Sequence, residues 1–148
     1  MVVAWVSDLD TGIGVIDDQH KKLLGYINQL AGDLDRASVG RVLEDLVDYT
    51  VSHFAFEENL QELAGYRDVQ SHKAVHDKFI QHVATFVERH ERGEDVVDDL
   101  YIMLSTWLID HIKRDDMAYV TEVRNNIIDI ISEKNRNEEP SWLNKNFQ

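Results

Sequence analysis

Five histidines and one glutamate interrupt four stretches of apolar residues that otherwise repeat at helical spacing. Burial of such a polar group is costly unless something pairs with it. A single histidine of this kind usually has a hydrogen-bond partner in the core, but the same interruption in four stretches indicates a shared function. The residues are His20, His53, Glu57, His72, His76 and His111.

The spacing and chemistry of these residues are typical of metal ligands. His53 and Glu57 are four positions apart, as are His72 and His76, so each pair lies on one helix face a turn apart. The chain has no cysteine, which excludes thiolate ligands and iron-sulfur clusters. Five imidazoles exceed what one tetrahedral zinc ion accepts, whereas nitrogen and oxygen ligands suit iron or manganese. Two ions are therefore the simplest interpretation.

Apolar residues at alternating spacings of three and four predict the helices that must position these ligands. Asp17, Ser38 and Asp95 are suited to cap the first, second and fourth helices, and Gly65 and Gly93 to end the second and third. The predicted ranges are Asp17–Arg36, Val39–Ala64, Val69–Arg92 and a fourth helix that begins after Asp95 and carries His111.

Short links between these helices predict an all-α fold, an up-down-up-down antiparallel four-helix bundle. An N-terminal arm that extends to Gly14 stands outside the bundle. An additional C-terminal helical segment, from about Val120 to Ile131, is expected on its exterior. The predicted organisation is one domain over residues 1–131, followed by a polar tail over residues 132–148.

Antiparallel packing brings the candidate ligands to one level of the bundle. The histidines of the first and third helices lie near the starts of these helices, and the remaining candidates lie near the ends of the second and fourth. These ends coincide in an antiparallel bundle. His90 is roughly 21 Å along the axis from His76 and is excluded from the cluster. His82 is off the apolar face and is expected in solvent.

Composition narrows the class of protein further. A chain of 148 residues with 43% hydrophobic content supports one domain with a real core. The formal net charge of -13 argues against nucleic acid and anionic membranes as partners. The N-terminus has no signal-peptide or membrane-span pattern, so a cytoplasmic location is the default expectation.

Four motifs together carry a resemblance that covers the chain from Gly12 to Tyr119. They resemble those of the hemerythrin family, specifically its bacterial members. The motifs are Ile16-Asp17-Asp18-Gln19-His20, His53-Phe54-Ala55-Phe56-Glu57-Glu58, His72 with His76, and Trp107-Leu108-Ile109-Asp110-His111-Ile112 leading to Asp116.

The resemblance implies two iron ions per chain with a bridging oxo or hydroxo group. One iron would be bound by His72, His76 and His111, and the other by His20 and His53. Glu57 and Asp116 would bridge both ions, which leaves one open position on the two-histidine iron. In the family, molecular oxygen binds there and leaves unchanged.

Helical geometry and the resemblance select different residues as the second bridging carboxylate. Asp115 is four positions after His111 and shares its face on a regular helix, whereas Asp116 is displaced by about 140°. The family spacing selects Asp116, and a distorted helix end would supply the missing rotation. We therefore predict Asp116 as the ligand and Asp115 as an exposed acid beside Arg114.

Apolar side chains are expected around the open position. Phe54, Trp107, Leu108 and Ile112 occupy the family's places for an oxygen pocket, although each is also an ordinary core residue. A dry pocket admits neutral oxygen and resists water and anions. Tyr66 and Tyr119 also resemble family tyrosines near the site. The sequence departs from the common pattern at Gln61, where methionine is frequent, and at Arg67, where proline often follows the tyrosine.

The expected function is reversible binding of oxygen for carriage, storage or delivery, without enzymatic turnover. One alternative is a di-iron oxidase or peroxidase, but such enzymes carry paired Glu-x-x-His motifs, and the sequence has none. A second alternative is sensing of oxygen or nitric oxide, read out by a separate partner. Of the three, the sequence favours carriage.

Overall fold

A computed structural model describes residues 3–136 of the chain. In this part of the chain the secondary structure is helical throughout. The elements are a 3-10 turn Ser7–Leu9, the α-helices α1 Gly14–Gln29, α2 Arg36–Ala64, α3 Val69–Glu91 and α4 Val97–His111, a π-helical segment Ile112–Asp116, and α5 Met117–Arg136.

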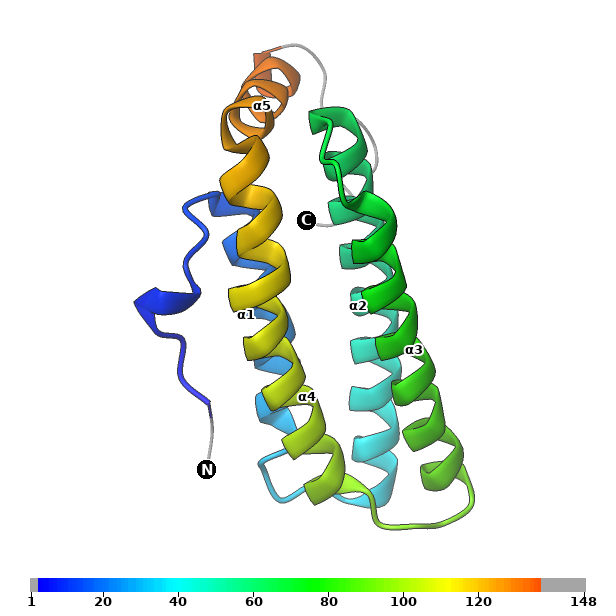
Figure 1. The fold of residues 1–148 in the computed structure, drawn as a ribbon. Helices are drawn as coiled ribbons and strands as arrows, with labels where there is room; N and C mark the ends of the chain where they lie inside the picture. Colours follow the sequence, from blue (N-terminus) through cyan, green and yellow to red (C-terminus); the bar gives the residue numbers. More distant parts are fainter. Residues whose placement is uncertain (1–2, 137–148) are drawn as a thin grey trace.

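The helices form an antiparallel up-down-up-down bundle, as predicted (Figure 1). Helices α1, α2 and α3 are one rod each, whereas α4, the π-helical segment and α5 follow one another as a single fourth rod. That rod bends at Val123, whose backbone leaves the helical region. The N-terminal arm lies outside the bundle, where the backbone of Val3 and the side chain of Asn28 on α1 exchange two hydrogen bonds.

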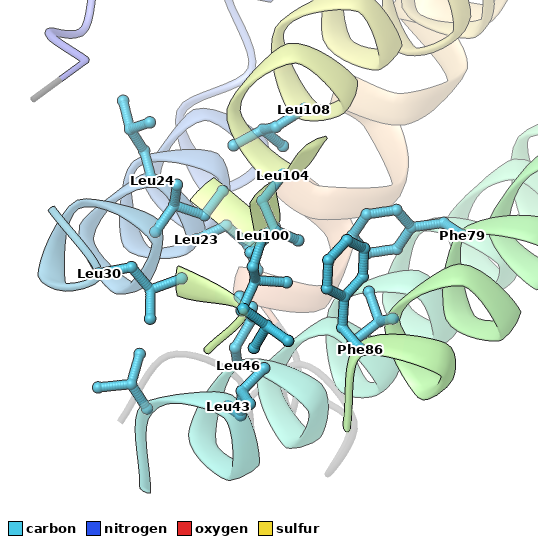
Figure 2. Packing of buried hydrophobic residues seen from close by; sticks show 14 of the residues in the cluster. Leu23, Leu24, Leu30, Leu43, Leu46, Phe79, Phe86, Leu100, Leu104 and Leu108 are labelled. Atoms are coloured by element: carbon cyan, nitrogen blue, oxygen red, sulfur yellow. The ribbon is translucent and has the colours of Figure 1, made fainter. Parts of the chain in front are cut away.

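Two apolar clusters fill the interior and leave a polar layer between them. The larger cluster occupies the half nearest the α1–α2 link, where leucines of three helices pack with Phe79 and Phe86 of α3 (Figure 2). The smaller one joins Ile16, Phe56 and Leu60 to Tyr119 and Ile127 of α5. The apolar face of α5 therefore lies in the core against α2. Our prediction of a segment on the bundle exterior was wrong, because α5 continues the fourth helix.

The start of α1 differs from the prediction, since it begins three residues before Asp17. The Asp17 carboxylate is buried and accepts hydrogen bonds from the backbone and hydroxyl groups of Thr11, each at 2.8 Å. It also accepts from the backbone of Gly12 at 3.2 Å. Asp17 thus ties the arm to α1 instead of capping the helix, because the arm turns back and offers its own donors.

The link between α1 and α2 is longer than predicted. Helix α1 ends at Gln29 instead of Arg36, and α2 begins at Arg36 instead of Val39. The side chain of Asp35 caps α2 by accepting a hydrogen bond from the Ser38 backbone at 2.8 Å. Ser38 therefore lies inside the helix that it was expected to cap, since Asp35 presents the better-placed acceptor.

The C-terminal ends of α2 and α3 agree with the sequence interpretation to within one residue. Gly65 ends α2 in the left-handed conformation, with φ of 80°, and Gly93 adopts φ of 95° just beyond α3. Asp95 is not the predicted cap of α4, because the N-cap residue is Val96 and has no side-chain cap hydrogen bond. Asp95 lies one residue earlier and accepts a hydrogen bond from the backbone of Val97 at 3.3 Å.

The C-terminal boundary at residue 131 stays a prediction. Helix α5 continues through the first five residues of the predicted tail, as far as Arg136, and residues 137–148 lie outside the described part of the chain. Within residues 3–136, no helix combines the length and the apolar character needed to cross a membrane.

Candidate metal centre

The polar layer between the two apolar clusters contains all seven predicted ligands. Helix α1 contributes one, α2 two and α3 two, while the last two come from the end of α4 and the end of the π-helical segment. Each is at most 4% exposed, which no charged or polar group tolerates without partners. The seven are His20, His53, Glu57, His72, His76, His111 and Asp116.

These side chains form two overlapping groups with the geometry of metal-binding clusters. Within each group, the nitrogen and oxygen atoms lie within 4.8 Å of one another. Glu57 belongs to both groups. One group consists of Glu57, His72, His76, His111 and Asp116, and the other of His20, His53 and Glu57.

Asp116 also reaches both sides of the layer. Its Oδ1 atom lies 3.2 Å from His72 Nε2 and 3.2 Å from His111 Nε2. Its Oδ2 atom lies 3.0 Å from His20 Nε2 on the opposite side. The two carboxylate oxygens thus face different groups of imidazoles, which is the geometry that a bridging carboxylate needs.

Glu57 also faces histidines of both groups, although its Oε1 atom alone lies near members of each. Its Oε1 atom lies 3.2 Å from His76 Nε2 and 3.5 Å from His53 Nε2, and its Oε2 atom lies 3.8 Å from His20 Nε2. Tyr119, which is fully buried, donates a hydrogen bond from its hydroxyl to Glu57 Oε2 at 2.9 Å. The tyrosine therefore holds the orientation of this carboxylate.

The π-helical segment explains why Asp116, and not Asp115, enters the layer. A π-helix has a wider turn than an α-helix, so a residue five positions after His111 returns to the same face. This is the distorted helix end that the spacing required. Asp115 is not the exposed acid we predicted, because it is 19% exposed and its Oδ2 atom accepts a hydrogen bond from His111 Nδ1 at 2.9 Å.

Three of the candidate histidines are held from behind through Nδ1. His53 lies 2.5 Å from Gln19 Oε1, and His76 lies 2.9 Å from Glu58 Oε2, in addition to the pairing of His111 with Asp115. An oxygen acceptor places the proton on Nδ1 and leaves the lone pair on Nε2, the atom that faces the layer. The tautomer suited to metal binding is therefore preset on these three rings.

Several buried atoms in the layer have no hydrogen-bond partner. They include Nε2 of His20 and of His72, Oε1 of Glu57, and both carboxylate oxygens of Asp116. Unpaired buried groups of this kind cost about 1–3 kcal/mol each. All five atoms point toward the same layer and are metal-ligating types, so the residues fit a centre with nitrogen and oxygen ligands such as non-haem iron.

Nearby carboxylates and burial shift the pKa values of the histidines in the layer in opposite directions. Burial alone lowers the pKa of a histidine, but the Asp116 and Glu57 carboxylates outweigh burial and raise the pKa of His20 to about 9 and that of His72 to about 10. Asp116, with the hydrogen bond to Asp115, likewise outweighs burial and raises the pKa of His111 to about 9. Burial lowers the pKa of His53 to about 3. Metal binding must therefore displace protons from the first three rings.

Neighbouring aromatic and aliphatic side chains cover one side of the layer. Phe54 stacks on His76 with ring centroids 3.6 Å apart, and Trp107 stacks on His111 at 4.3 Å. Leu108 joins Phe54 and Trp107 in the lining of an apolar cavity of about 10 Å³. Ile112 is fully buried but does not line this cavity.

Sequence reasoning missed the residues that support the ligands. Gln19, Glu58 and Asp115 each follow or precede a predicted ligand by one to four positions. Only the four-residue spacing of His111 and Asp115 could have indicated a pairing. The two tyrosines expected near the site have different roles in the structure. Tyr119 donates a hydrogen bond to Glu57, whereas Tyr66 packs on Tyr119 with ring centroids 5.9 Å apart. His82 is exposed and His90 lies away from the layer, as expected.

The sequence is similar to a known protein family and to individual members of it. The family model described as the hemerythrin HHE cation binding domain matches residues 11–123. A bacteriohemerythrin of Pseudomonas aeruginosa is 43% identical, covering 99% of this chain and 95% of the relative. One from Stenotrophomonas maltophilia is 47% identical, covering 83% of this chain and 82% of the relative.

A solved structure of a hemerythrin has a similar fold. The crystal structure of a wild-type hemerythrin matches with a TM-score of 0.75 and 33% identity, covering 80% of this chain and 95% of that chain. The range matched by the family model contains all seven residues of the polar layer.

Proposed function

The chain belongs to the hemerythrin family, and from that premise we propose that it binds molecular oxygen reversibly at two non-haem iron ions. The observation that carries the proposal is the single buried layer in which two bridging carboxylates join two unequal groups of imidazoles. Oxygen carriage, storage or delivery is the role that such a centre suits.

The proposal assigns each residue of the layer a role. His72, His76 and His111 hold one iron, and His20 and His53 hold the other. Glu57 and Asp116 would contribute ligands to both ions, with an oxo or hydroxo group completing the centre. The two-histidine side has fewer protein ligands, so it is the side that leaves a position for a small ligand. When bound, the iron pair supplies the electrons that reversible oxygen binding requires.

The surrounding side chains favour release of oxygen over its consumption. Phe54 and Trp107 present ring faces to His76 and His111, on the three-histidine side. Together with Leu108 they line a cavity of about 10 Å³, close to the smallest space that holds one water molecule. Scarce water and scarce protons disfavour further reaction of a bound ligand. Seven protein ligands also leave little room for an organic substrate at the metals, which argues against an oxidase.

An oxygen titration of the reduced, iron-loaded protein tests this function. The visible spectrum is followed as oxygen is added and then removed by argon, over repeated cycles. We expect saturation at one oxygen per two irons and full return of the starting spectrum. Continuous consumption of oxygen in the presence of a reductant would instead identify an oxidase or peroxidase.

A further inference from the structure

Metal ions in the layer do not account for every unpaired buried atom around it. The Nδ1 atom of His20 lacks a hydrogen-bond partner, and so do both side-chain amide atoms of Gln61. His20 and Gln61 are each 0% exposed. Since Nε2 is the His20 atom that faces the carboxylates, Nδ1 of the same ring points away from the layer, and an ion bound to Nε2 cannot satisfy it.

The positions of the two residues bring them to the same place in the bundle. Gln61 lies four residues after Glu57 on α2, so the two side chains share one helix face. Glu57 Oε2 lies 3.8 Å from His20 Nε2 across the interface of α1 and α2. Ile16, one turn before His20, and Leu60, beside Gln61, belong to the same apolar cluster. The chain therefore buries an amide without partners one turn along α2 from Glu57, the residue that faces His20, whose Nδ1 atom also lacks a partner.

Three other imidazoles of the layer have the Nδ1 hydrogen-bond partner that His20 lacks. His53 has the Gln19 amide, His76 has Glu58 and His111 has Asp115. A partner of this kind fixes the tautomer and the orientation of a metal-binding imidazole. His20 faces both candidate bridging carboxylates, as His72 does on the other side, so an unheld His20 ring would weaken the centre.

We propose that Gln61 is a positioning residue for His20. The Oε1 atom of Gln61 accepts the Nδ1 proton of His20, either directly after rotation of the amide or through one ordered water. The arrangement gives both imidazoles of the two-histidine side a neutral glutamine partner, Gln19 for His53 and Gln61 for His20. This inference rests on the proposed assignment of His20 as a metal ligand.

A titration with Co²⁺ alone tests the proposal without any use of oxygen. Metal-free protein is titrated in competition with a chelator, and the absorption bands of the bound ions are followed. Gln61→Met keeps the length of the side chain but removes the acceptor, and Gln61→Glu restores an acceptor oxygen. The exposed Gln81 on α3 supplies the matched control, Gln81→Met. Circular dichroism checks that each variant is folded.

We expect Gln61→Met to weaken one of the two ions by about 10–100-fold and to leave the other unchanged. Gln61→Glu should recover most of that loss, and Gln81→Met should match the parent protein. Unchanged affinity for both ions in Gln61→Met would overturn the proposal. So would equal weakening of both ions, or a failure of Gln61→Glu to recover binding, because either result would assign Gln61 to packing alone.

A failure of the proposed function would be seen in the parent protein and not in the Gln61 variants. If the parent protein itself took up only one Co²⁺, the two-ion centre would be wrong. If Gln61→Met does not fold, Gln61→Glu carries the test, since an acceptor at this position predicts two bound ions with an altered spectrum for one of them. A spectrum identical to the parent's for both ions would then contradict the role of Gln61.

Discussion

The two sides of the polar layer hold their imidazoles by different means. On the side of α3 and α4, His76 and His111 donate to the carboxylates Glu58 and Asp115 and stack on Phe54 and Trp107. On the side of α1 and α2, His53 faces the neutral amide of Gln19. A carboxylate partner makes an imidazole more basic than an amide partner does. In the proposed centre, the first side would therefore bind its ion more tightly, and the second would hold the ion that takes the exchangeable ligand.

Removal of the shared carboxylate should abolish this difference by destroying the centre. Asp116→Ala deletes the group that faces imidazoles on both sides, at 3.0 and 3.2 Å, and leaves Glu57 as the remaining bridging carboxylate near the rings of His20, His72 and His111. We expect loss of both irons, measured by elemental analysis after purification.

Asp115→Ala provides the matched control for that variant. It removes only the Nδ1 partner of His111, so it should retain both irons and lower the affinity for one by about 10–100-fold. Loss of iron confined to Asp115→Ala would mean that the helix is regular in solution and that Asp115 is the ligand.

A change in the apolar cover should leave both sets of ligands intact and alter access to them. Leu108→Ala enlarges the apolar cavity beside the layer, and because Leu108 is buried it should cost about 2–5 kcal/mol of unfolding free energy. Oxidation of the reduced iron-loaded protein in air should become several-fold faster, as water reaches the centre more easily.

Ile112→Val is the control for this variant, since Ile112 is buried beside the layer but does not line the cavity. Stopped-flow absorption measures oxidation, and chemical denaturation measures stability. An oxidation rate in Leu108→Ala equal to that of the control would remove Leu108 from the proposed oxygen pocket.

Exchange of the hydrogen-bond partners of His76 and His53 should make the ion affinities of the two sides more alike. Glu58→Gln gives His76 a neutral partner, and Gln19→Glu gives His53 a charged one. The first should weaken one ion by about tenfold and the second should strengthen the other, as measured by Co²⁺ titration. If neither variant alters the affinity for either ion, the different partners of the two sides do not affect metal binding.

The last prediction concerns protons in the metal-free protein. The pKa values of His20, His72 and His111 are raised to about 9–10 from 6.5, so their contribution to stability is complete below pH 6.5 and is lost as the pH rises through 9–10. The pKa of His53 is lowered to about 3, so its contribution is lost as the pH falls below 6.5.

Metal-free stability should therefore peak near pH 6.5 and decline on the alkaline side, while the extra stability from bound metal grows over that same range. Thermal unfolding between pH 5 and 10, with and without Co²⁺, measures both trends. A rise of metal-free stability between pH 7 and 9 would contradict the proton occupancy of these three rings.

The convergence of the histidines was predictable because it depends on few assumptions. Spacing of three and four identifies helices, short links make them antiparallel, and the positions of His20, His53 and His111 within their helices then place them at one level. Small errors at the helix ends, such as that at the start of α1, do not disturb this inference, because the ligands lie inside the helices.

Asp116 illustrates where residue spacing is insufficient. A regular helix favours Asp115, and the π-helical turn that reverses this choice is a local backbone state without a distinct sequence signal. The resemblance to a known family, and not helical geometry, selected the correct residue for the layer.

The supporting residues could not be predicted for a different reason. Glu58 and Gln19 are polar residues next to ligands, and most such residues on a helix face solvent. Asp17 was mistaken for a helix cap because an aspartate that caps a helix and one that holds an arm use the same acceptor chemistry. In each case the partner comes from a segment whose position only the tertiary structure defines.

A crystal structure of the iron-loaded protein, with anomalous data collected at the iron edge, tests the central claim most directly. We predict two iron peaks in the polar layer, one bonded to His72, His76 and His111 and the other to His20 and His53, with Glu57 and Asp116 bonded to both. A single peak, or two peaks with Asp116 bonded to neither, would contradict a centre of two unequal ions joined by shared carboxylates.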